Sequence, residues 1–344
     1  MEKLLSIAIP CYNVEWCLEK CLCSFLAEPV IEDLEVIIVN DGSTDGTRAI
    51  AEKYVDKRPA SYRLINKDNG GHGSAINKAI NLATGKYFTA VDADDWVITE
   101  NLDKFLGVLA NTDADAIITH YHTVDMASGC RNEKKTRDIP FGRLYTPDEF
   151  VSYGRGAFEC AVYHGLTYKT LTYKESAAKL TEGVFYEDHE YATLPFTKVR
   201  TILPLDLFLY QYLIGNSGQS VAEDKQIRQL GHLETVIRRL FECHRENPGV
   251  SEGARRYIAR KATDLLVSYY IIAMIKNPDK RGGREAASQL RREMQNIGPT
   301  LVSDTDRRYK IAVAMSRLGF STKTLGAFKR IVPYGLFRKW YIKE

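Results

Sequence analysis

The chain has 344 residues, of which 44% are hydrophobic and 26% charged; this composition is typical of a folded protein and excludes an intrinsically disordered chain. Its length allows one large domain with a smaller one, or two of ordinary size. The net charge of +3 hides a division: residues 1–224 carry 22 Lys and Arg against 33 Asp and Glu (−11), and residues 225–344 carry 25 against 11 (+14). An acidic module followed by a basic one indicates that the second faces an anionic partner, nucleic acid or anionic lipid.

Membrane and disulfide signals are weak. The longest apolar candidate, Leu265–Ile275, has eleven residues, well below the ~18 that a membrane span needs. The N-terminus lacks the layout of a signal peptide. The seven cysteines are odd in number and form no Cys-x-x-Cys pair, which favours small buried side chains over zinc ligands. We therefore expect a cytoplasmic chain, at most peripheral to a membrane.

The first half alternates short β-branched runs with helical patterns, which is typical of a parallel sheet with crossover helices. The expected strands are Leu5–Ile9 (ended by Pro10), Leu34–Asn40, Tyr62–Asn66, Lys86–Val91 and Ala114–Thr119, and the expected helices are Val14–Leu26, Arg48–Val55 and Ser74–Ala83. After about Ser217 helical patterns dominate, at Lys225–Glu246, Ser251–Ile275, Gly283–Asn296 and Arg307–Leu318. The sequence predicts an α/β domain over residues 1–215 with a mostly parallel sheet, followed by a smaller basic helical module over residues 216–344.

Asp41 follows an expected buried strand and precedes an expected helix. In an open α/β sheet, ligands bind outside the carboxyl ends of the strands. A carboxylate at that place can accept an N–H of a nucleotide base or a ribose hydroxyl. Ser43, Thr44 and Asp45, which come next, are good helix-capping residues, so the motif alone supports a structural interpretation as well as a ligand-binding one.

Three acids, Asp92, Asp94 and Asp95, follow the strand expected at Lys86–Val91. Because side chains alternate along a strand, we expect Asp92 and Asp94 on one side and Asp95 on the other. Two carboxylates so close together repel unless a cation lies between them. Such oxygen ligands suit Mg²⁺ or Mn²⁺, so the pattern predicts a divalent-metal site at Asp92 and Asp94.

Two further segments carry weaker signals. Residues 69–74 (Asn-Gly-Gly-His-Gly-Ser) form a glycine-rich loop before an expected helix. Such a loop lets the backbone approach a ligand and favours an anion, although its spacing matches no phosphate-loop fingerprint. Residues 183–190 place several acids at the start of a helix-like stretch. These acids are either first-turn residues favoured by the helix dipole or include a general base.

Taken together, five segments resemble family 2 glycosyltransferases with the GT-A fold in their order and spacing. They are Ser6–Asn13, Val39–Thr47, Asn69–Gly71, Val91–Trp96 and Tyr186–Asp188. The resemblance covers roughly residues 1–215. It implies inverting transfer of a sugar from a nucleotide-sugar donor, usually a UDP-sugar, with Mn²⁺ or Mg²⁺ as the cofactor.

The resemblance also implies which residues bind the donor. Pro10 and Tyr12 resemble the loop beside the nucleotide base, with Tyr12 placed to stack on it. Asp41 is similar to the base-binding aspartate of the family. Asn69 and Gly70 resemble the donor-side loop.

The reacting groups are implied in the same way. Asp92 resembles the acid on the ribose and diphosphate side, and Asp94 the metal ligand, with Asp92 beside it. Asp188 resembles the catalytic base, and the acceptor is expected near Glu187 and Tyr168. These roles agree with the chemistry, because a metal neutralises the charge on the leaving diphosphate while a carboxylate on the opposite face deprotonates the acceptor hydroxyl.

The C-terminal tail adds an expectation about the acceptor. After Phe320, apolar and aromatic residues share one side of a helical pattern and basic residues the other: Leu325, Phe328, Ile331, Val332, Leu336, Phe337, Trp340 and Tyr341 against Arg338, Lys339 and Lys343. This pattern is typical of an interfacial membrane helix, and a terminal helix docked on the protein's own core is the alternative. No nucleic-acid recognition motif accompanies the charge. We expect an anionic membrane surface, a lipid-linked or saccharide acceptor, and a peripheral position on the inner face of the cell membrane.

Two other functions remain open at this point. A nucleotidyltransferase shares the α/β layout and the acid pair, and a catalytically silent module would bind a nucleotide-sugar without turning it over. The retained acids Asp41, Asp92, Asp94 and Asp188 argue against the silent module. Tyr210–Tyr212, with Ser217–Ser220 nearby, resembles a segment that closes over donor phosphates in the family, although the basic residue often found there is missing.

Overall fold

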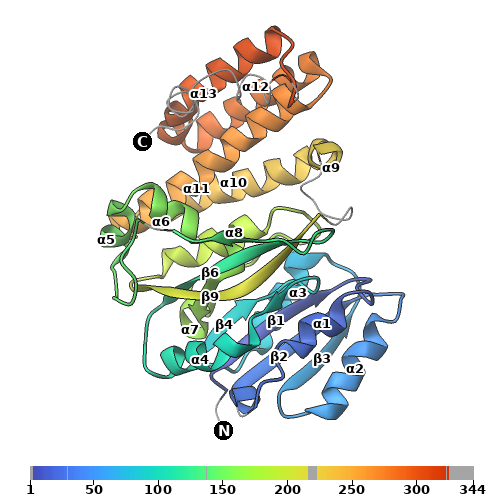
Figure 1. The fold of residues 1–344 in the computed structure, drawn as a ribbon. Helices are drawn as coiled ribbons and strands as arrows, with labels where there is room; N and C mark the ends of the chain where they lie inside the picture. The colour runs from blue at the N-terminus through green and yellow to red at the C-terminus, as the bar shows by residue number, and fades with distance from the viewer. Residues whose placement is uncertain (1–2, 29, 137, 216–222, 323, 325–344) are drawn as a thin grey trace. The chain divides into compact units, whose positions relative to one another are not determined.

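The computed structural model describes residues 3–28, 30–136, 138–215, 223–322 and 324 (Figure 1). The chain divides into two compact units. The first comprises Met1–Ser217 together with Ser251–Ala254, and the second comprises Gly218–Val250 and Arg255–Glu344. The predicted boundary after residue 215 lies two residues before this division. The predicted Ser217–Ser220 segment and the amphipathic tail from Leu325 onward lie outside the described residues.

A single sheet organises the first unit, with strand order β3-β2-β1-β4-β8-β6-β9-β5, and β7 pairs with β6. The strands are β1 Leu5–Cys11, β2 Leu34–Asp41, β3 Tyr62–Lys67, β4 Tyr87–Ala90, β5 Trp96–Val97, β6 Ala116–Asp125, β7 Arg131–Lys134, β8 Leu166–Lys169 and β9 Ile202–Ile214. Strands β1 to β4 run parallel, as do β6 and β9. The remaining pairs, which involve β5, β7 and β8, are antiparallel. The α/β prediction with a mostly parallel sheet is confirmed.

Helices cover this sheet. They are α1 Leu18–Cys23, α2 Thr47–Lys57, α3 His72–Leu82, α4 Leu102–Ala110, α5 Pro147–Ser152, α6 Arg155–Cys160, α7 Thr170–Glu175 and α8 Asp188–Thr193, with short 3₁₀ turns η1 Val30–Asp33, η2 Thr99–Asn101, η3 Tyr163–Gly165 and η4 Leu194–Thr197. Every residue of β1 and β2 is buried, as expected for strands covered on both faces. Leu5, Ile7 and Ile9 share a core with Leu18 of α1 and Phe105 of α4, whereas α3 lies on the other face (Figure 1).

Two element boundaries differ from expectation. Strand β1 continues through Pro10, which pairs in register with Val39, to Cys11. A proline costs the ladder only its own N–H and so need not end a strand. Helix α1 begins only at Leu18, because the preceding loop bonds to a neighbouring turn instead of continuing a helix: the Val14 N–H donates to Oγ1 of Thr47 (2.8 Å).

The second unit is helical, as predicted. Its helices are α9 Glu223–Arg228, α10 Leu230–Glu246, α11 Glu252–Ile271 with a π-helical continuation η5 Ile272–Lys276, α12 Lys280–Ile297 and α13 Pro299–Arg317. The first three residues of α11 belong to the first unit. Within the ranges described above, no helix is both long and apolar enough to cross a membrane.

Candidate active site

Strands β1 and β2 end side by side, and the loops that follow them are tied together. Asn13, in the left-handed region with φ 53°, accepts the Thr44 N–H through Oδ1 (2.8 Å), and its own N–H donates to Oγ of Ser43 (3.1 Å). Ser43 and Thr44 therefore hold the facing loop, whereas Asp45 caps α2, because its Oδ1 accepts the N–H of Thr47, the first residue of that helix (3.0 Å). Beside this bridge Tyr12 stands 53% exposed, so its ring is free to contact a ligand.

Asp41 lies at the end of β2 and is only 1% exposed. Its Oδ1 accepts Nζ of Lys67 (2.5 Å) and the Gly70 N–H (3.0 Å), and its Oδ2 accepts the Gly71 N–H (2.8 Å). The structure thus brings Asp41 together with the predicted Asn69–Gly70 loop and shows the carboxylate holding that loop in place. A contact between Asp41 and a nucleotide base stays a prediction.

The glycines of the loop permit a close backbone approach. Gly71 has φ +86°, and a Cβ added there would lie 2.9 Å from the backbone nitrogen of Gly183. The Gly183 N–H donates to the Gly70 carbonyl (2.9 Å). A Cβ on Gly73 would lie 2.7 Å from the Thr181 carbonyl oxygen. The loop therefore packs, backbone against backbone, on the segment that leads to the predicted catalytic base.

The three acids after β4 form a turn, here called the acid turn (Asp92–Asp95). Strand β4 ends at Ala90, and the Asp95 N–H donates to the Asp92 carbonyl (3.0 Å). Strand alternation does not extend into a turn, so the expectation that Asp95 points away from Asp92 is wrong. Asp95 is 1% exposed and accepts the Tyr210 hydroxyl (2.6 Å) and the Leu213 N–H (2.7 Å).

Asp92, Asp95 and His164 form the one three-residue group in the described part of the chain that could hold a metal ion. Their ligand atoms all lie within 4.8 Å of one another. Burial, then Asp92 and Asp94, raises the pKa of Asp95 well above its usual range. Burial and Asp92 raise the pKa of Asp94 to about 6. Such crowding of carboxylates is relieved by a cation, and two carboxylates with an imidazole suit Mn²⁺ or Mg²⁺. The residues therefore fit a divalent metal, although Asp94 lies outside this group.

His72, the first residue of α3, lies between two carboxylates. Its Nε2 is 2.9 Å from Oδ1 of Asp92, and its Nδ1 is 2.7 Å from Oε1 of Glu187. Burial lowers the pKa of His72, but the two carboxylates outweigh burial and raise it well above its usual range. The ring is therefore an imidazolium that links the acid turn to the residue before Asp188. The Tyr163 hydroxyl also donates to Oδ1 of Asp92 (2.7 Å).

Asp188 begins α8 two residues after a strained residue, since Tyr186 has φ +74°. Such a conformation is costly for a non-glycine residue and gathers at functional sites. Burial lowers the pKa of His164, and the charges of Asp92 and Asp188 oppose it. His164 stacks on Tyr212 with ring centroids 4.1 Å apart. The charges of Asp92 in the acid turn and of Asp188 in α8 therefore both act on the pKa of His164.

Comparison with known proteins assigns the chain to a family. The model of glycosyl transferase family 2 matches residues 6–166, and the glycosyltransferase YibD of Escherichia coli is 38% identical over 249 residues, 69% of this chain and 70% of YibD. The chain belongs to glycosyl transferase family 2. The glycosyltransferase EpsJ of Bacillus subtilis is 30% identical over 217 residues, 62% of this chain, and the match spans only 61% of EpsJ.

Solved structures confirm that the chain has a GT-A-like fold. Staphylococcus aureus TarS 1–349, in complex with UDP-GlcNAc, superposes with a TM-score of 0.67 at 16% identity, covering 92% of each chain. The mannosyltransferase PcManGT of Pyrobaculum calidifontis, in complex with GDP-Man and Mn²⁺, has a TM-score of 0.51 at 18% identity and covers 92% of this chain and 88% of its own.

The two residues expected on the acceptor side, Tyr168 and Glu187, are both buried. Tyr168, on β8, is 0% exposed, and its hydroxyl donates to the Tyr191 carbonyl (3.0 Å). It presents no surface to an acceptor, so the acceptor-side role expected for it is not retained. Glu187 is 6% exposed and forms an ion pair with His72. It therefore stabilises the site through His72 and offers little surface to an acceptor.

The sequence analysis gave no role to three residues that the fold brings to this site: His72, Tyr163 and His164. His72 was visible only as part of a glycine-rich loop, and no spacing pattern marked Tyr163 or His164. The Tyr210–Tyr212 segment contacts the acid turn through Tyr210, and its closing over donor phosphates stays a prediction.

Proposed function

We propose that this chain is an inverting, divalent-metal-dependent glycosyltransferase that moves a hexosyl or N-acetylhexosaminyl group from a UDP-sugar to an acceptor hydroxyl. The observation that carries the proposal is the metal-suited group Asp92, Asp95 and His164, with a separate carboxylate, Asp188, whose charge also acts on the pKa of His164. Asp92 belongs to a group suited to a metal, and Asp188 belongs to a separate segment, the start of α8. Separate groups for the leaving diphosphate and the attacking hydroxyl are what an inverting transfer requires.

The donor would lie over the carboxyl ends of β1 and β2. Pro10 and Tyr12 border this place, and Tyr12 is half-exposed, as a ring that stacks on a base must be. Asp41 fixes the Asn69–Gly70 loop, which we assign to the donor side. The fold shared with TarS, crystallised with UDP-GlcNAc, supports a uridine nucleotide.

Asp92 and Asp95 with His164 would hold the metal, and Asp94 is a further candidate ligand beside them. The metal would supply electrostatic stabilisation of the charge that develops on the leaving diphosphate. His72 adds a positive charge at Asp92 and keeps this carboxylate ionised. The Tyr163 hydroxyl fixes the same oxygen, so the carboxylate is held in one orientation before the donor arrives.

Asp188 would act as the general base. In an inverting transfer the acceptor hydroxyl attacks the anomeric carbon from the face opposite the leaving group, and its proton passes to a carboxylate on that face. Glu187 is held by His72, and the strained Tyr186 sets the turn into α8. The ion pair of Glu187 and the turn at Tyr186 therefore constrain the segment that carries Asp188.

We further propose a lipid-linked or glycolipid acceptor in bacterial cell-surface polysaccharide synthesis, with the enzyme peripheral on the inner membrane face. The support is the amphipathic sequence of residues 325–344, which lies outside the described structure. Chondroitin synthase and hyaluronan synthase of Pasteurella multocida are each 43% identical to this chain, over 94 residues that make up 10% of their length. This similarity supports a polysaccharide product.

The test is release of nucleoside diphosphate across a panel of UDP-, GDP- and dTDP-sugars, with Mn²⁺ or EDTA and with or without membrane lipid extract. We expect one UDP-sugar to turn over only with metal, and lipid extract to raise the rate. Asp188→Asn should lower kcat by about 10²–10⁴-fold with donor affinity retained, whereas Asp103→Asn, on the exposed face of α4, should behave as the unaltered chain. Diphosphate release from a nucleoside triphosphate would favour a nucleotidyltransferase. Donor binding without release, in the presence of lipid extract, would favour a silent module.

A further inference from the structure

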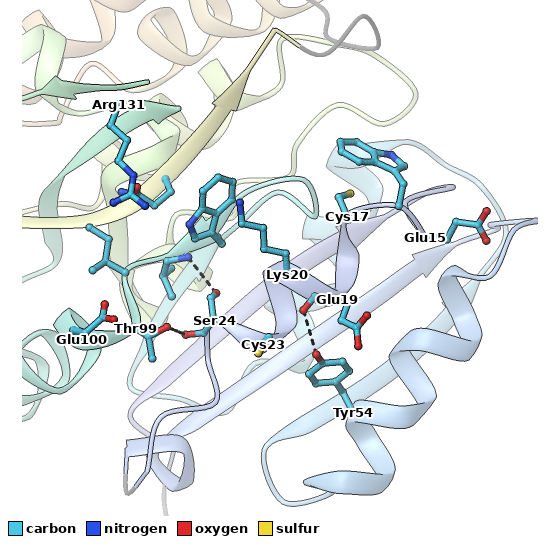
Figure 2. Close-up of a pocket in the computed structure, with 15 residues that line it drawn as sticks. Glu15, Cys17, Glu19, Lys20, Cys23, Ser24, Tyr54, Thr99, Glu100 and Arg131 are labelled. Carbon is cyan, nitrogen blue, oxygen red and sulfur yellow. Dashed lines mark hydrogen bonds between the residues drawn. The ribbon is translucent and has the colours of Figure 1, made fainter. Parts of the chain in front are cut away.

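A cavity of about 840 Å³ lies beside the acid turn, and none of the residues assigned above to the metal or to the general base lines it. Its walls come from α1 with the loop before it, from β5 with the residues after it, and from Arg131 of β7 (Figure 2). Trp96, which lines it, directly follows the acid turn in the chain. We call this cavity the α1–β7 pocket, and its volume falls in the range of small-molecule sites.

Every hydroxyl group that lines the α1–β7 pocket gives its proton to a backbone carbonyl. Oγ of Ser24 donates to the Cys21 carbonyl (2.7 Å), and Oγ1 of Thr99 donates to the Ser24 carbonyl (2.8 Å). The Tyr54 hydroxyl donates to the Glu19 carbonyl (3.1 Å), and this bond and that of Thr99 are dashed in Figure 2. These bonds tie α1 to η2 and to α2, so the pocket is preformed, but its hydroxyls have no proton left for a ligand.

Gln211 brings an unmet hydrogen-bond acceptor to the sheet wall of the pocket. It is 1% exposed and pairs in register with Trp96 of β5 and His122 of β6, so these side chains project from the same face of the sheet. Its Nε2 donates to Nδ1 of His122 (2.8 Å) and to the Tyr210 carbonyl (3.1 Å). Its Oε1 has no hydrogen-bond partner among the described residues. Because a buried acceptor without a partner is costly, a ligand that donates to this oxygen would be favoured.

The charged lining adds acceptors and does not form an anion site. It consists of three carboxylates and two cations: Glu15, Glu19, Glu100, Lys20 and Arg131. The carboxylates of Glu19 and Glu100 take part in no ion pair or hydrogen bond of the described residues. With more negative than positive groups in the lining, and the acid turn beside it, a bound phosphate or carboxylate would be repelled. The pocket therefore favours a neutral ligand that supplies hydrogen-bond donors.

Two indole rings give the pocket its apolar surface. Nζ of Lys20 lies 3.0 Å from the ring centroid of Trp96 and covers that ring, as a cation–π contact does. Trp16 is 51% exposed and offers its ring to a ligand. A flat aromatic ring packs well against the C–H face of a pyranose, whose hydroxyls donate hydrogen bonds at its edge. A saccharide thus combines the apolar face and the donors that this pocket lacks.

We propose that the α1–β7 pocket binds a neutral saccharide, with a pyranose ring on Trp16 and hydroxyls donating to the two unpaired carboxylates and to Oε1 of Gln211. The proposal rests on the proposed function in one respect, since it takes this saccharide to be part of the acceptor. It deepens that function by giving the acceptor an uncharged glycan portion and a place of binding next to the acid turn.

Tryptophan fluorescence provides a direct test, because two of the three tryptophans of the chain line the pocket. The unaltered chain is titrated in EDTA, so that no metal ion takes part, with cellobiose, lactose, di-N-acetylchitobiose and the open-chain polyol sorbitol. We expect at least one disaccharide to give a saturable change at concentrations at least tenfold below those of sorbitol. Glucose 6-phosphate should bind no more tightly than glucose. Exposed Cys23 also lines the pocket, so the bound disaccharide should slow its alkylation.

The decisive variant is Trp16→Ala, measured by calorimetry because it removes one of the fluorescent rings. Its side chain is half-exposed, so the fold should survive, and thermal unfolding checks this. We expect the affinity for the disaccharide to fall at least tenfold, which corresponds to about 1.4 kcal/mol. The matched control is Leu171→Ala on α7, which is 58% exposed and lies outside the pocket, and it should bind as the unaltered chain does.

A second variant, Glu19→Gln/Glu100→Gln, tests the carboxylates. Both side chains are exposed, and each glutamine keeps the shape of the glutamate but loses its charge. Because hydrogen bonds to ionised acceptors are the stronger ones, the affinity for the disaccharide should fall at least threefold. Removal of two negative charges should at the same time tighten the binding of glucose 6-phosphate.

Three results would overturn the proposal: no saturable binding of any of the three disaccharides, an unchanged affinity in Trp16→Ala, or displacement of the disaccharide by UDP, which would assign the pocket to the donor. Turnover of a UDP-sugar by the same preparation separates this inference from the proposed function. A chain that turns over the donor but binds no disaccharide refutes the inference alone. A chain that binds the disaccharide but neither binds nor turns over any donor refutes the proposed function and keeps the pocket as a saccharide site.

Discussion

The link formed by His72 gives a sharp prediction. His72→Ala removes the imidazolium between Asp92 and Glu187, whose oxygens lie 2.9 and 2.7 Å from its ring nitrogens. The side chain of Glu187 is only 7% exposed, while those of His72 and Asp92 are 32% and 29% exposed. The variant therefore leaves the nearly buried carboxylate of Glu187 without a counter-charge. The carboxylate of Asp92 also loses its partner but is partly solvated by water.

The magnitude follows from this difference in exposure. Breaking a fully buried ion pair costs about 3–5 kcal/mol, and a surface pair contributes about 0–1 kcal/mol. The His72–Glu187 pair is close to the buried case, and the His72–Asp92 pair lies between the two cases. We therefore expect the free energy of unfolding to fall by about 2–3 kcal/mol. For a unit of roughly 200 residues, with about 2–4 °C for each kcal/mol, the midpoint of unfolding should fall by about 4–12 °C.

Thermal and urea unfolding in EDTA measures this loss, with Arg48→Ala as the control, because its pair with Glu52 is exposed. A double-mutant cycle with Glu187→Gln tests the cause. Removing the orphaned carboxylate as well should recover part of the loss, with a coupling energy of about 1 kcal/mol or more. Losses that add within about 0.5 kcal/mol, or a midpoint equal to that of the control, would refute the argument that His72 joins these carboxylates.

Three further outcomes are expected. Gly71→Ala should destabilise the chain by more than about 1 kcal/mol in urea unfolding, because Gly71 has φ +86° and a Cβ there would touch the backbone of Gly183. Gly107→Ala in α4 is the control: nothing lies within 4 Å of the new methyl group, so it should stabilise the chain by about 0.5–1 kcal/mol. Tyr210→Phe removes the hydroxyl that serves the acid turn and should lower both stability, by about 1–3 kcal/mol, and the affinity for Mn²⁺ measured by calorimetry. At pH 8 a maleimide should label exposed Cys23 within minutes and leave Cys21 unlabelled, because burial raises the pKa of Cys21 and keeps it a thiol. Mass spectrometry that finds both cysteines rapidly labelled would contradict this.

Local pattern was enough for the first half of the sheet. Strands β1 and β2 are short runs rich in Val, Ile and Leu, a composition typical of parallel strands buried on both faces. Strand β3, at the end of the strand order, was also predicted, although only its Tyr62 is buried. The positions of Asp41 and Asp92 also followed, since both directly follow such a run and ligands gather at the carboxyl ends of the strands. Strand β9, Ile202–Ile214, was not predicted. It pairs with β6, which lies about 86 residues earlier in the chain (Ala116 with Ile202), so local sequence does not reveal the pairing.

Contacts between residues far apart in the chain decided the rest. The sequence by itself determined the fold class, the family and the order of the acids, since these depend on local composition and on the order of short motifs along residues 1–215. The tertiary structure decided that Asp95 turns toward Asp92, that Tyr168 is buried, and that His72 joins the acid turn to Glu187. Each of these depends on a turn or a cross-segment contact. Strand periodicity ends at Ala90, and no local spacing encodes a bond between residues 72 and 187.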